Sequence, residues 1–421
     1  MFKFIHAADI HLDSPLWGLE RYEGAPVEDI RGSTRRALEN LVRLAIEEHV
    51  DFVLLVGDLY DGDWKDYNTA LFLSKEVSKL REVGIQVFIV TGNHDAASQI
   101  TRSLRMPDNV KIFSIRKPET VLLERIGVAI HGQGFRQRVV MEDLSTGYPA
   151  AMPGYVNIGM LHTAATGREG HDPYAPCTIE GLLSKKYDYW ALGHVHKREI
   201  IHEAPWIIFP GNTQGRHIRE TGPKGCSLVK VDDDKCITVD HRDLHVLQWI
   251  RCEVDATDAD TSEEVIEKTR SLIMGHIDKG DGRFIAVRVI ITGTCKAHDE
   301  LSMQSEKWIN EIRSVVTDAS GRMVWIENVE IKTRTQIDLE ELLKREDSFG
   351  DLLKFIKSIE SSDDLFKSIK DDFTALRAKL PSELFVGSDA YNLESPENVQ
   401  EILEEVKQLL IPKLFSAGGN R

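Results

Sequence analysis

Residues 85–98 read IQVFIVTGNHDAAS, an apolar run followed at once by a polar turn. The apolar side chains of IQVFIV predict a strand that is buried on both faces. The turn GNHD places Asn93, His94 and Asp95 directly at the end of that strand. Ligands of open α/β sheets bind outside the carboxyl ends of the strands, so these side chains are expected to face a site at the rim of the core.

Similar apolar runs recur through the first 240 or so residues and predict further strands. They read FKFIHAAD, FVLLVGD, IGVAIHG, VNIGMLHT, YDYWALGH and WIIFPGN. Helical patterns over 33–49 and 68–84 separate the early runs, with Ser33 as a plausible N-cap and Gly84 as a plausible stop. Strands that alternate with helices and then follow one another predict a two-sheet sandwich with α/β/β/α layers.

The pattern changes near residue 246, which divides the chain into three predicted parts. Residues 1–245 hold the strand-rich sandwich. Residues 246–336 have the order of a small βαβαβ capping domain. Residues 337–421 show only helical patterns, with apolar side chains three and four positions apart, and are predicted to form a helical segment that docks a partner.

Composition favours a cytoplasmic protein. The chain has 421 residues, of which 42% are hydrophobic, yet no apolar stretch approaches the roughly 18 residues that a membrane span needs. The start MFKFIHAADIH enters a strand pattern at once, so no signal peptide is expected. Five cysteines without a CxxC pair argue against a zinc or disulfide framework. The net charge of −16 argues weakly against nucleic acid as a partner.

Five of the predicted strands end in side chains that bind metal ions. They supply Asp9 and His11, then Asp58, then Asn93, then His162, and finally His194 and His196. Oxygen and nitrogen ligands without a thiolate suit Mn²⁺, Fe or Zn²⁺. Seven candidate ligands are too many for one ion, whereas two ions about 3.5–4 Å apart and bridged by a carboxylate use them all. His217, which follows another strand, is a weaker candidate for lining the site.

The ordered set D-x-H, G-D, G-N-H-D, H, G-H-x-H resembles that of the calcineurin-like metallophosphoesterases. The resemblance implies that two ions activate a water for attack on a phosphodiester. It assigns one ion to Asp9, His11, Asp58 and His196, and the other to Asp58, Asn93, His162 and His194. Asp58 would bridge the ions, and His94 would lie beside the scissile phosphate without binding metal. Asp95 would either orient the His94 ring or cap a helix.

Within that superfamily the chain looks most like the SbcD-type DNA-repair nucleases and the bacterial YhaO group. The residues that carry this are ADIHLDSP (8–15), GDLYD (57–61) and the small α/β domain followed by helices. The resemblance implies Mn²⁺, DNA, an SbcC-like or YhaN-like SMC-type ATPase and a homodimer, for which Leu16, Trp17 and Leu19 offer apolar surface. Archaeal and eukaryotic relatives have histidine where this chain has Asp61, so that residue's role cannot be carried over.

Three functions remain open on the sequence. The first is a Mn²⁺-dependent DNA exonuclease or endonuclease in double-strand-break repair, which the capping domain and helical segment favour. The second is a phosphodiesterase or phosphatase for a small nucleotide or lipid phosphoester, which the negative charge favours. The third is a metal-binding scaffold with little catalysis. Residues 98–138 contain eight basic and three acidic side chains. The basic side chains form either a DNA-binding surface or a solvated basic face.

Overall fold

A computed structural model describes most of the first 335 residues. The described ranges are 1–14, 27–61, 67–97, 106–165, 174–279, 282–321 and 323–335, with a few single positions beyond them. The chain divides into two compact units, of which the first comprises Met1–Arg251, Gly280–Val287 and Met323–Glu327. Nearly all of the predicted docking segment 337–421, and the apolar residues Leu16, Trp17 and Leu19, lie outside the described residues.

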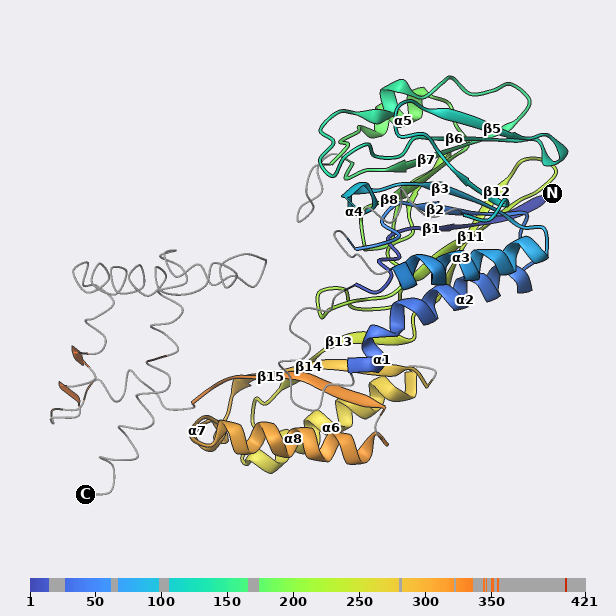
Figure 1. Cartoon of the computed structure of the whole chain (residues 1–421). Helices are drawn as coiled ribbons and strands as arrows, with labels where there is room; N and C mark the ends of the chain where they lie inside the picture. Colours follow the sequence, from blue (N-terminus) through green and yellow to red (C-terminus); the bar gives the residue numbers. More distant parts are fainter. Residues whose placement is uncertain are drawn as a thin grey trace. The chain divides into compact units, whose positions relative to one another are not determined.

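Two six-stranded sheets form the body of the first unit (Figure 1). The first sheet has the order β12-β11-β1-β2-β3-β4, with bounds Ile237–Asp243, Gly225–Val231, Phe2–Ala7, Phe52–Val56, Gln86–Val90 and Val110–Ile112. Its β1 to β4 are parallel, and β11 joins β1 antiparallel. The second sheet has the order β5-β6-β7-β8-β10-β9, with bounds Glu119–Leu123, Val128–Gly132, Val156–His162, Tyr189–Gly193, Trp206–Phe209 and Glu199–Glu203.

Alternating side chains of the first sheet build two separate cores. Ile5 of β1 packs with apolar residues of α2 (Ser33–Glu47) and α3 (Tyr67–Glu82), which cover one face of the sheet. Phe4, its neighbour, points to the other face and packs with residues of the second sheet. The outer face of the second sheet packs under the short helix α5 (Ile179–Ser184). These layers confirm the predicted α/β/β/α sandwich.

The ends of the two long helices test the predicted capping residues. Gly84 follows α3 with φ of 78°, a left-handed conformation that suits glycine after a helix, as predicted. The prediction for Ser33 is wrong, because Gly32 is the N-cap of α2 and no side chain caps it. The Ser33 hydroxyl donates to the Ile30 carbonyl of α1 (Val27–Arg31), so it ties α2 to the preceding turn.

A third sheet has the order β13-β14-β15, with bounds Leu247–Asp255, Phe284–Thr294 and Val324–Arg334. Helix α6 (Ser262–Lys279) follows β13, and α7 (His298–Met303) and α8 (Ser305–Ala319) follow β14. The sequence order of these elements matches the predicted βαβαβ pattern, while the domain boundaries themselves stay a prediction. Within the described ranges, no helix combines the length and apolar character that a membrane crossing requires.

Candidate metal centre

The polar side chains at the strand ends meet at one edge of the sandwich. Asp9 and His11 follow β1, Asp58 follows β2, and the short helix α4 (Asn93–Ala97) follows β3. His162 ends β7, and His194 and His196 follow β8. Their donor atoms form three overlapping groups that are each compact enough for a metal ion: Asp9, His11 and His196; His11, Asp58 and His94; and Asp58, His162 and His194. Six of the seven predicted ligands therefore come together with His94 in these groups.

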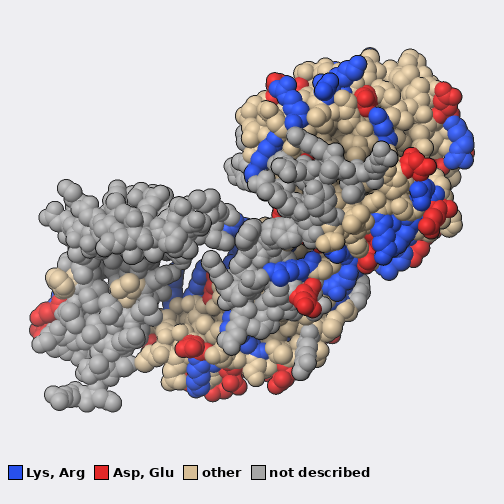
Figure 2. Space-filling model, viewed as in Figure 1, with Lys and Arg blue, Asp and Glu red and all other residues tan. Residues whose placement is uncertain are grey.

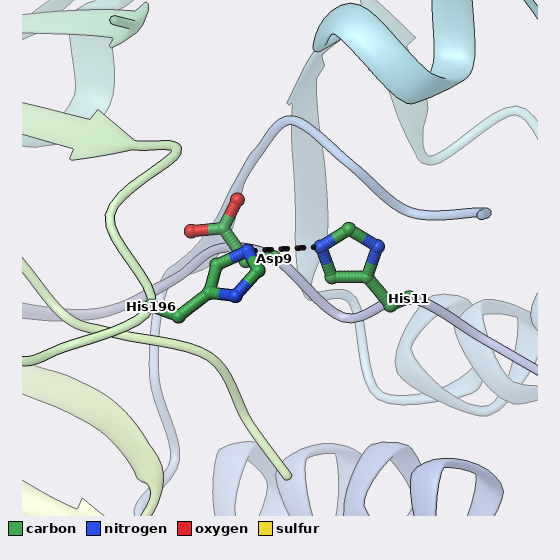
Figure 3. A group of neighbouring side chains, drawn as sticks. All are labelled: Asp9, His11 and His196. Carbon is green, nitrogen blue, oxygen red and sulfur yellow. Dashed lines mark hydrogen bonds between the residues drawn. The ribbon is translucent and has the colours of Figure 1, made fainter. Parts of the chain in front are cut away.

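Figure 3 shows one half of this cluster. The Nε2 atoms of His11 and His196 face each other at 3.1 Å, and the Asp9 carboxylate lies beside them. Asp9 also accepts the backbone N–H of His194 with both oxygens, at 3.0 Å each. The loops after β1 and β8, which lie far apart in the sequence, are thereby joined at the centre of the cluster.

The other half is arranged around Asp58. Its Oδ2 atom lies 3.4 Å from Nε2 of His162 and 3.9 Å from Nε2 of His11. Asn93 adds its Oδ1 atom at 3.0 Å from Nε2 of His162. Asp58 is thus the carboxylate that lies between the two halves, which is the position that a bridging ligand requires.

The donor set fits two divalent ions. Two imidazole nitrogens that bind one ion at about 2.1 Å and at right angles to each other lie ~3 Å apart. The His11–His196 separation of 3.1 Å agrees with that geometry, and both nitrogens face the same space. Carboxylate, amide and imidazole donors without a thiolate match Mn²⁺, Fe or Zn²⁺. The assignment of each side chain to one ion stays a prediction.

Four of the predicted ligands have an unusual backbone. Asp9, His11 and Asp58 have φ of 51°, 46° and 51°, and His194 has φ of 101°. Non-glycine residues rarely adopt positive φ, and each such residue costs of order 1–3 kcal/mol when the surrounding structure imposes it. The neighbouring loops supply that constraint, since His11 donates its backbone N–H to the Asp58 carbonyl at 2.9 Å.

The glycine before Asp58 is required by close packing. A Cβ atom on Gly57 would overlap the ring of His162, and the residue has φ of 79°. Any side chain at this position would therefore displace a predicted ligand. Glycine at this position permits the close approach of the backbone to the His162 ring.

Asp61 is the carboxylate that contacts the ring of His94. Its Oδ1 atom lies 3.0 Å from Nδ1 of His94 and 3.7 Å from Nδ1 of His11, and its Oδ2 accepts the Ser14 hydroxyl at 2.5 Å. Burial disfavours the charged form of His94, but the Asp61 and Asp58 carboxylates together outweigh it and raise the pKa of His94. Sequence reasoning left the role of Asp61 undefined, because only the fold brings it to this ring.

Asp95 has a different position from the one that a ring-orienting role needs. It accepts backbone N–H groups of Leu59 at 2.9 Å, Tyr60 at 3.1 Å and Gly92 at 2.9 Å. The Gly92 contact caps the turn that begins α4, so the helix-cap alternative agrees with the structure. The contacts to Leu59 and Tyr60 also hold the loop after β2 against the loop after β3.

The loop after β10 adds charged residues that sequence reasoning missed. Glu220 is buried, and its Oε1 atom lies 2.6 Å from Nδ1 of His196. Arg216 lies between Glu220 and Asp61. His217, the weaker candidate, lies 3.6 Å from Glu220 with its side chain 54% exposed, and it belongs to none of the three metal-type groups found in the described residues.

Comparison with known proteins identifies the family. Residues 2–198 match the model of the calcineurin-like phosphoesterases, and residues 249–334 match that of the metallophosphoesterase YhaO middle domain. "Uncharacterized metallophosphoesterase YhaO" of Bacillus subtilis is 35% identical over 367 residues, which cover 86% of this chain and 88% of that protein. The chain therefore belongs to the calcineurin-like metallophosphoesterases with a YhaO-type middle domain. It is a phosphoester hydrolase by family, and the family's fold implies two divalent metal ions.

More distant relatives also match. "DNA double-strand break repair protein Mre11" of Archaeoglobus fulgidus is 23% identical over 411 residues, covering 88% of this chain and 84% of that protein. The protein of the same name from Saccharolobus solfataricus is 27% identical over 206 residues, covering 47% of this chain and 50% of that protein. Among solved structures, a dimetal phosphatase from Danio rerio aligns with 58% of this chain and 96% of its own, at 12% identity and a TM-score of 0.35.

Proposed function

We propose that the chain is a Mn²⁺-dependent phosphodiester hydrolase that acts on DNA, as an exonuclease or endonuclease in double-strand-break repair. The observation that carries the chemistry is the convergence of seven donor side chains with His94 at one edge of the sandwich. The observation that favours DNA is the match to an archaeal DNA double-strand break repair protein over 88% of this chain, well beyond the metal centre.

The side chains of this site divide the work of hydrolysis. Two divalent ions bound here would supply positive charge for the phosphate oxygens and a more acidic water. His94 has Nδ1 turned to Asp61, which leaves Nε2 for the substrate. Because its pKa is raised, His94 carries a proton more readily than an ordinary histidine and can give it to the leaving oxygen at Nε2. Its side chain is 26% exposed, so a substrate can reach it.

The charges around the sandwich do not add to the case for DNA. Arg125 lies 3.7 Å from Asp51, which precedes β2, so it sits at the edge opposite Asp58. Lys111 and Arg136 pair with Glu119 and Glu142. Figure 2 shows basic and acidic side chains interspersed over the described surface on this side. Three of the basic residues between 98 and 138 thus lie near acidic side chains, while Arg102 and Arg105 lie outside the described residues.

The experiment that tests this function compares three substrates. Purified chain, stripped by chelation and reloaded with Mn²⁺, is incubated with linear duplex DNA, circular single-stranded DNA and bis-p-nitrophenyl phosphate. Cleavage of linear but not circular DNA indicates an exonuclease, and cleavage of the circle indicates an endonuclease. The same chain with Asp58→Asn is the control for contaminating nuclease.

A small-molecule phosphoesterase is the second candidate. The net charge of −16 favours it, because a polyanionic substrate such as DNA is repelled by a strongly negative chain. Rapid hydrolysis of a mononucleotide or lipid phosphoester, with no cleavage of either DNA, would replace the first proposal by this one. Steep loss of DNA binding with rising salt would support the first.

We also propose a partner, an SMC-like coiled-coil ATPase of the SbcC or YhaN type. The support is the set of apolar stripes predicted in residues 337–421 and the SbcD resemblance; these residues lie almost wholly outside the described part of the chain. Deleting residues 337–421 should abolish co-purification with the ATPase while sparing metal binding and cleavage of simple substrates. Full binding by the shortened chain would contradict this role. The homodimer implied by the same resemblance is tested by measuring the mass in solution.

A further inference from the structure

Glu220 is a buried carboxylate with an unusually complete set of donors. Its Oε1 atom lies 2.6 Å from Nδ1 of His196 and 3.2 Å from Nη2 of Arg216. Its Oε2 atom accepts the backbone N–H of Arg216 and the Nδ2 of Asn212, both at 2.8 Å. The residue is 6% exposed. A buried carboxylate held at both oxygens has a fixed orientation, so it can fix the ring that it contacts.

The contact to His196 has a direct consequence for the opposite side of that ring. An imidazole that donates Nδ1–H to a carboxylate keeps the Nε2 lone pair for a metal ion, and the carboxylate makes that nitrogen more basic. Nε2 of His196 is the atom that faces Nε2 of His11 inside the cluster. Glu220 therefore stands behind a predicted ligand in the position from which it selects the metal-binding tautomer.

Arg216 connects this carboxylate to a second one. Its Nη1 atom lies 3.5 Å from Oδ2 of Asp61, and its Nη2 atom lies 3.2 Å from Oε1 of Glu220. Asp61 contacts His94, and Glu220 contacts the predicted ligand His196. One guanidinium therefore lies between the carboxylates that contact these two histidines. The Arg216 side chain is 13% exposed, and this burial from water makes the geometry of both contacts matter.

We propose that Arg216 and Glu220 are positioning residues that couple metal binding at His196 to the orientation of His94. Glu220 acts on the metal through His196. Arg216 acts on both His196 and His94, because its planar guanidinium contacts Glu220 with one nitrogen and Asp61 with the other. The inference rests on the proposed function for the part that concerns His94, whereas the part that concerns metal affinity needs no substrate.

The planar guanidinium of Arg216 allows a substitution that tests the proposal selectively. Lysine keeps the positive charge but offers a single ammonium, which cannot hold two carboxylates in a fixed plane. Arg216→Lys thus separates geometry from charge. Glu220→Gln keeps the size and one oxygen but removes the negative charge behind His196. Arg219→Gln changes an exposed residue of the same loop and serves as the matched control.

The test measures Mn²⁺ binding by calorimetry on the full chain after chelation, together with kcat and KM for bis-p-nitrophenyl phosphate. Glu220→Gln should weaken one of the two Mn²⁺ sites by about 10–100-fold and leave the other within twofold of the parent. Arg216→Lys should weaken the same site and also lower kcat with little change in KM. Asp61→Asn should lower kcat. Arg219→Gln should match the parent.

Several results would overturn the proposal. The first is unchanged Mn²⁺ affinity in Glu220→Gln, and the second is parental behaviour of Arg216→Lys in both measurements. The third is an equal loss of affinity at both Mn²⁺ sites together with a lower unfolding temperature of the metal-free chain, because that result marks a merely structural role. The double variant Arg216→Gln with Glu220→Gln removes both charges together and is used if a single variant does not fold; parental affinities in it also refute the coupling. A parent that binds two ions yet cleaves no phosphodiester refutes the proposed function alone, while the affinity comparison still decides this inference.

Discussion

The Nδ1 atom of His94 lies 3.0 Å from the Oδ1 atom of Asp61, three positions after Asp58 in the sequence. The contact crosses from the loop after β2 to the helix after β3, so the two loops share one charged pair. The carboxylate contributes to the raised pKa of His94 and lies on the Nδ1 side of its ring. A carboxylate therefore stands behind the ring of His94, on the side opposite the nitrogen proposed to meet the substrate.

Replacing His94 should separate turnover from metal binding. We expect His94→Ala to keep two ions per chain and to lose about 10²–10⁴-fold in kcat, since general acid catalysis typically contributes that much. Elemental analysis and steady-state kinetics measure the two quantities. His49→Asn, at an exposed histidine that follows α2, is the control and should change neither. Loss of an ion from His94→Ala would make His94 a ligand and refute its proposed role.

Asp58 should behave in the opposite way. Its Oδ2 atom is near both His11 and His162, so it is the side chain expected to bridge the ions. We predict that Asp58→Ala abolishes hydrolysis and reduces bound metal from two ions to one or none. Metal content after gel filtration checks the stoichiometry. If the variant retained two ions and measurable turnover, the bridging assignment would be wrong.

Metal exchange should show a preference for Mn²⁺ over Mg²⁺. Four of the predicted ligands are imidazoles, namely His11, His162, His194 and His196, whereas Mg²⁺ prefers oxygen ligands and retains its waters. After chelation, addition of Mn²⁺ should restore cleavage, and Mg²⁺ at the same concentration should restore it poorly. Equal rates with the two ions would contradict this view of the site. Zn²⁺ and Fe²⁺ added in parallel establish which other ions the donors accept.

The burial of His6 predicts that the folded chain loses stability in mild acid. The residue is fully buried, with Nδ1 2.9 Å from the Tyr189 hydroxyl and Nε2 3.0 Å from the Leu192 carbonyl, and burial lowers its pKa to about 3. Below the unfolded pKa of about 6.5 the unfolded chain binds a proton that the folded chain excludes. Stability is therefore full above pH 6.5 and falls as the pH drops toward 3, by about 1.4 kcal/mol per pH unit.

Urea unfolding of the metal-free chain at pH 6.5 and 5.5 measures this effect. His6→Gln removes the titrating group, so the variant should lose about 1 kcal/mol less than the parent over that interval. The variant starts from a lower stability, because glutamine does not reproduce the shape of the imidazole, and only the difference between the two pH values is compared. Equal losses in parent and variant would show that His6 does not cause the acid sensitivity.

The sequence predicted the sandwich and the set of converging side chains because both follow from local patterns. Apolar runs gave the strands, and each polar side chain followed a run directly, so parallel strands had to bring them to one edge. The positions of Asp61, Arg216 and Glu220 could not be predicted, since their contacts join loops that are adjacent only after folding. The same reason applies to Arg125, which lies close to a cluster of basic residues in the sequence but pairs with Asp51 at the far edge.

The left-handed backbone at His11 and His194 has a consequence for engineering this enzyme. Glycine accepts such conformations without steric cost, whereas a residue with a Cβ atom adopts positive φ less readily. A library screened only for resistance to heat would therefore enrich glycine at these two positions. The resulting variants would be more robust and inactive. Thermostable forms should be sought with the metal present and with turnover as a second criterion, because the backbone at both positions favours glycine whereas the predicted ligand role requires histidine.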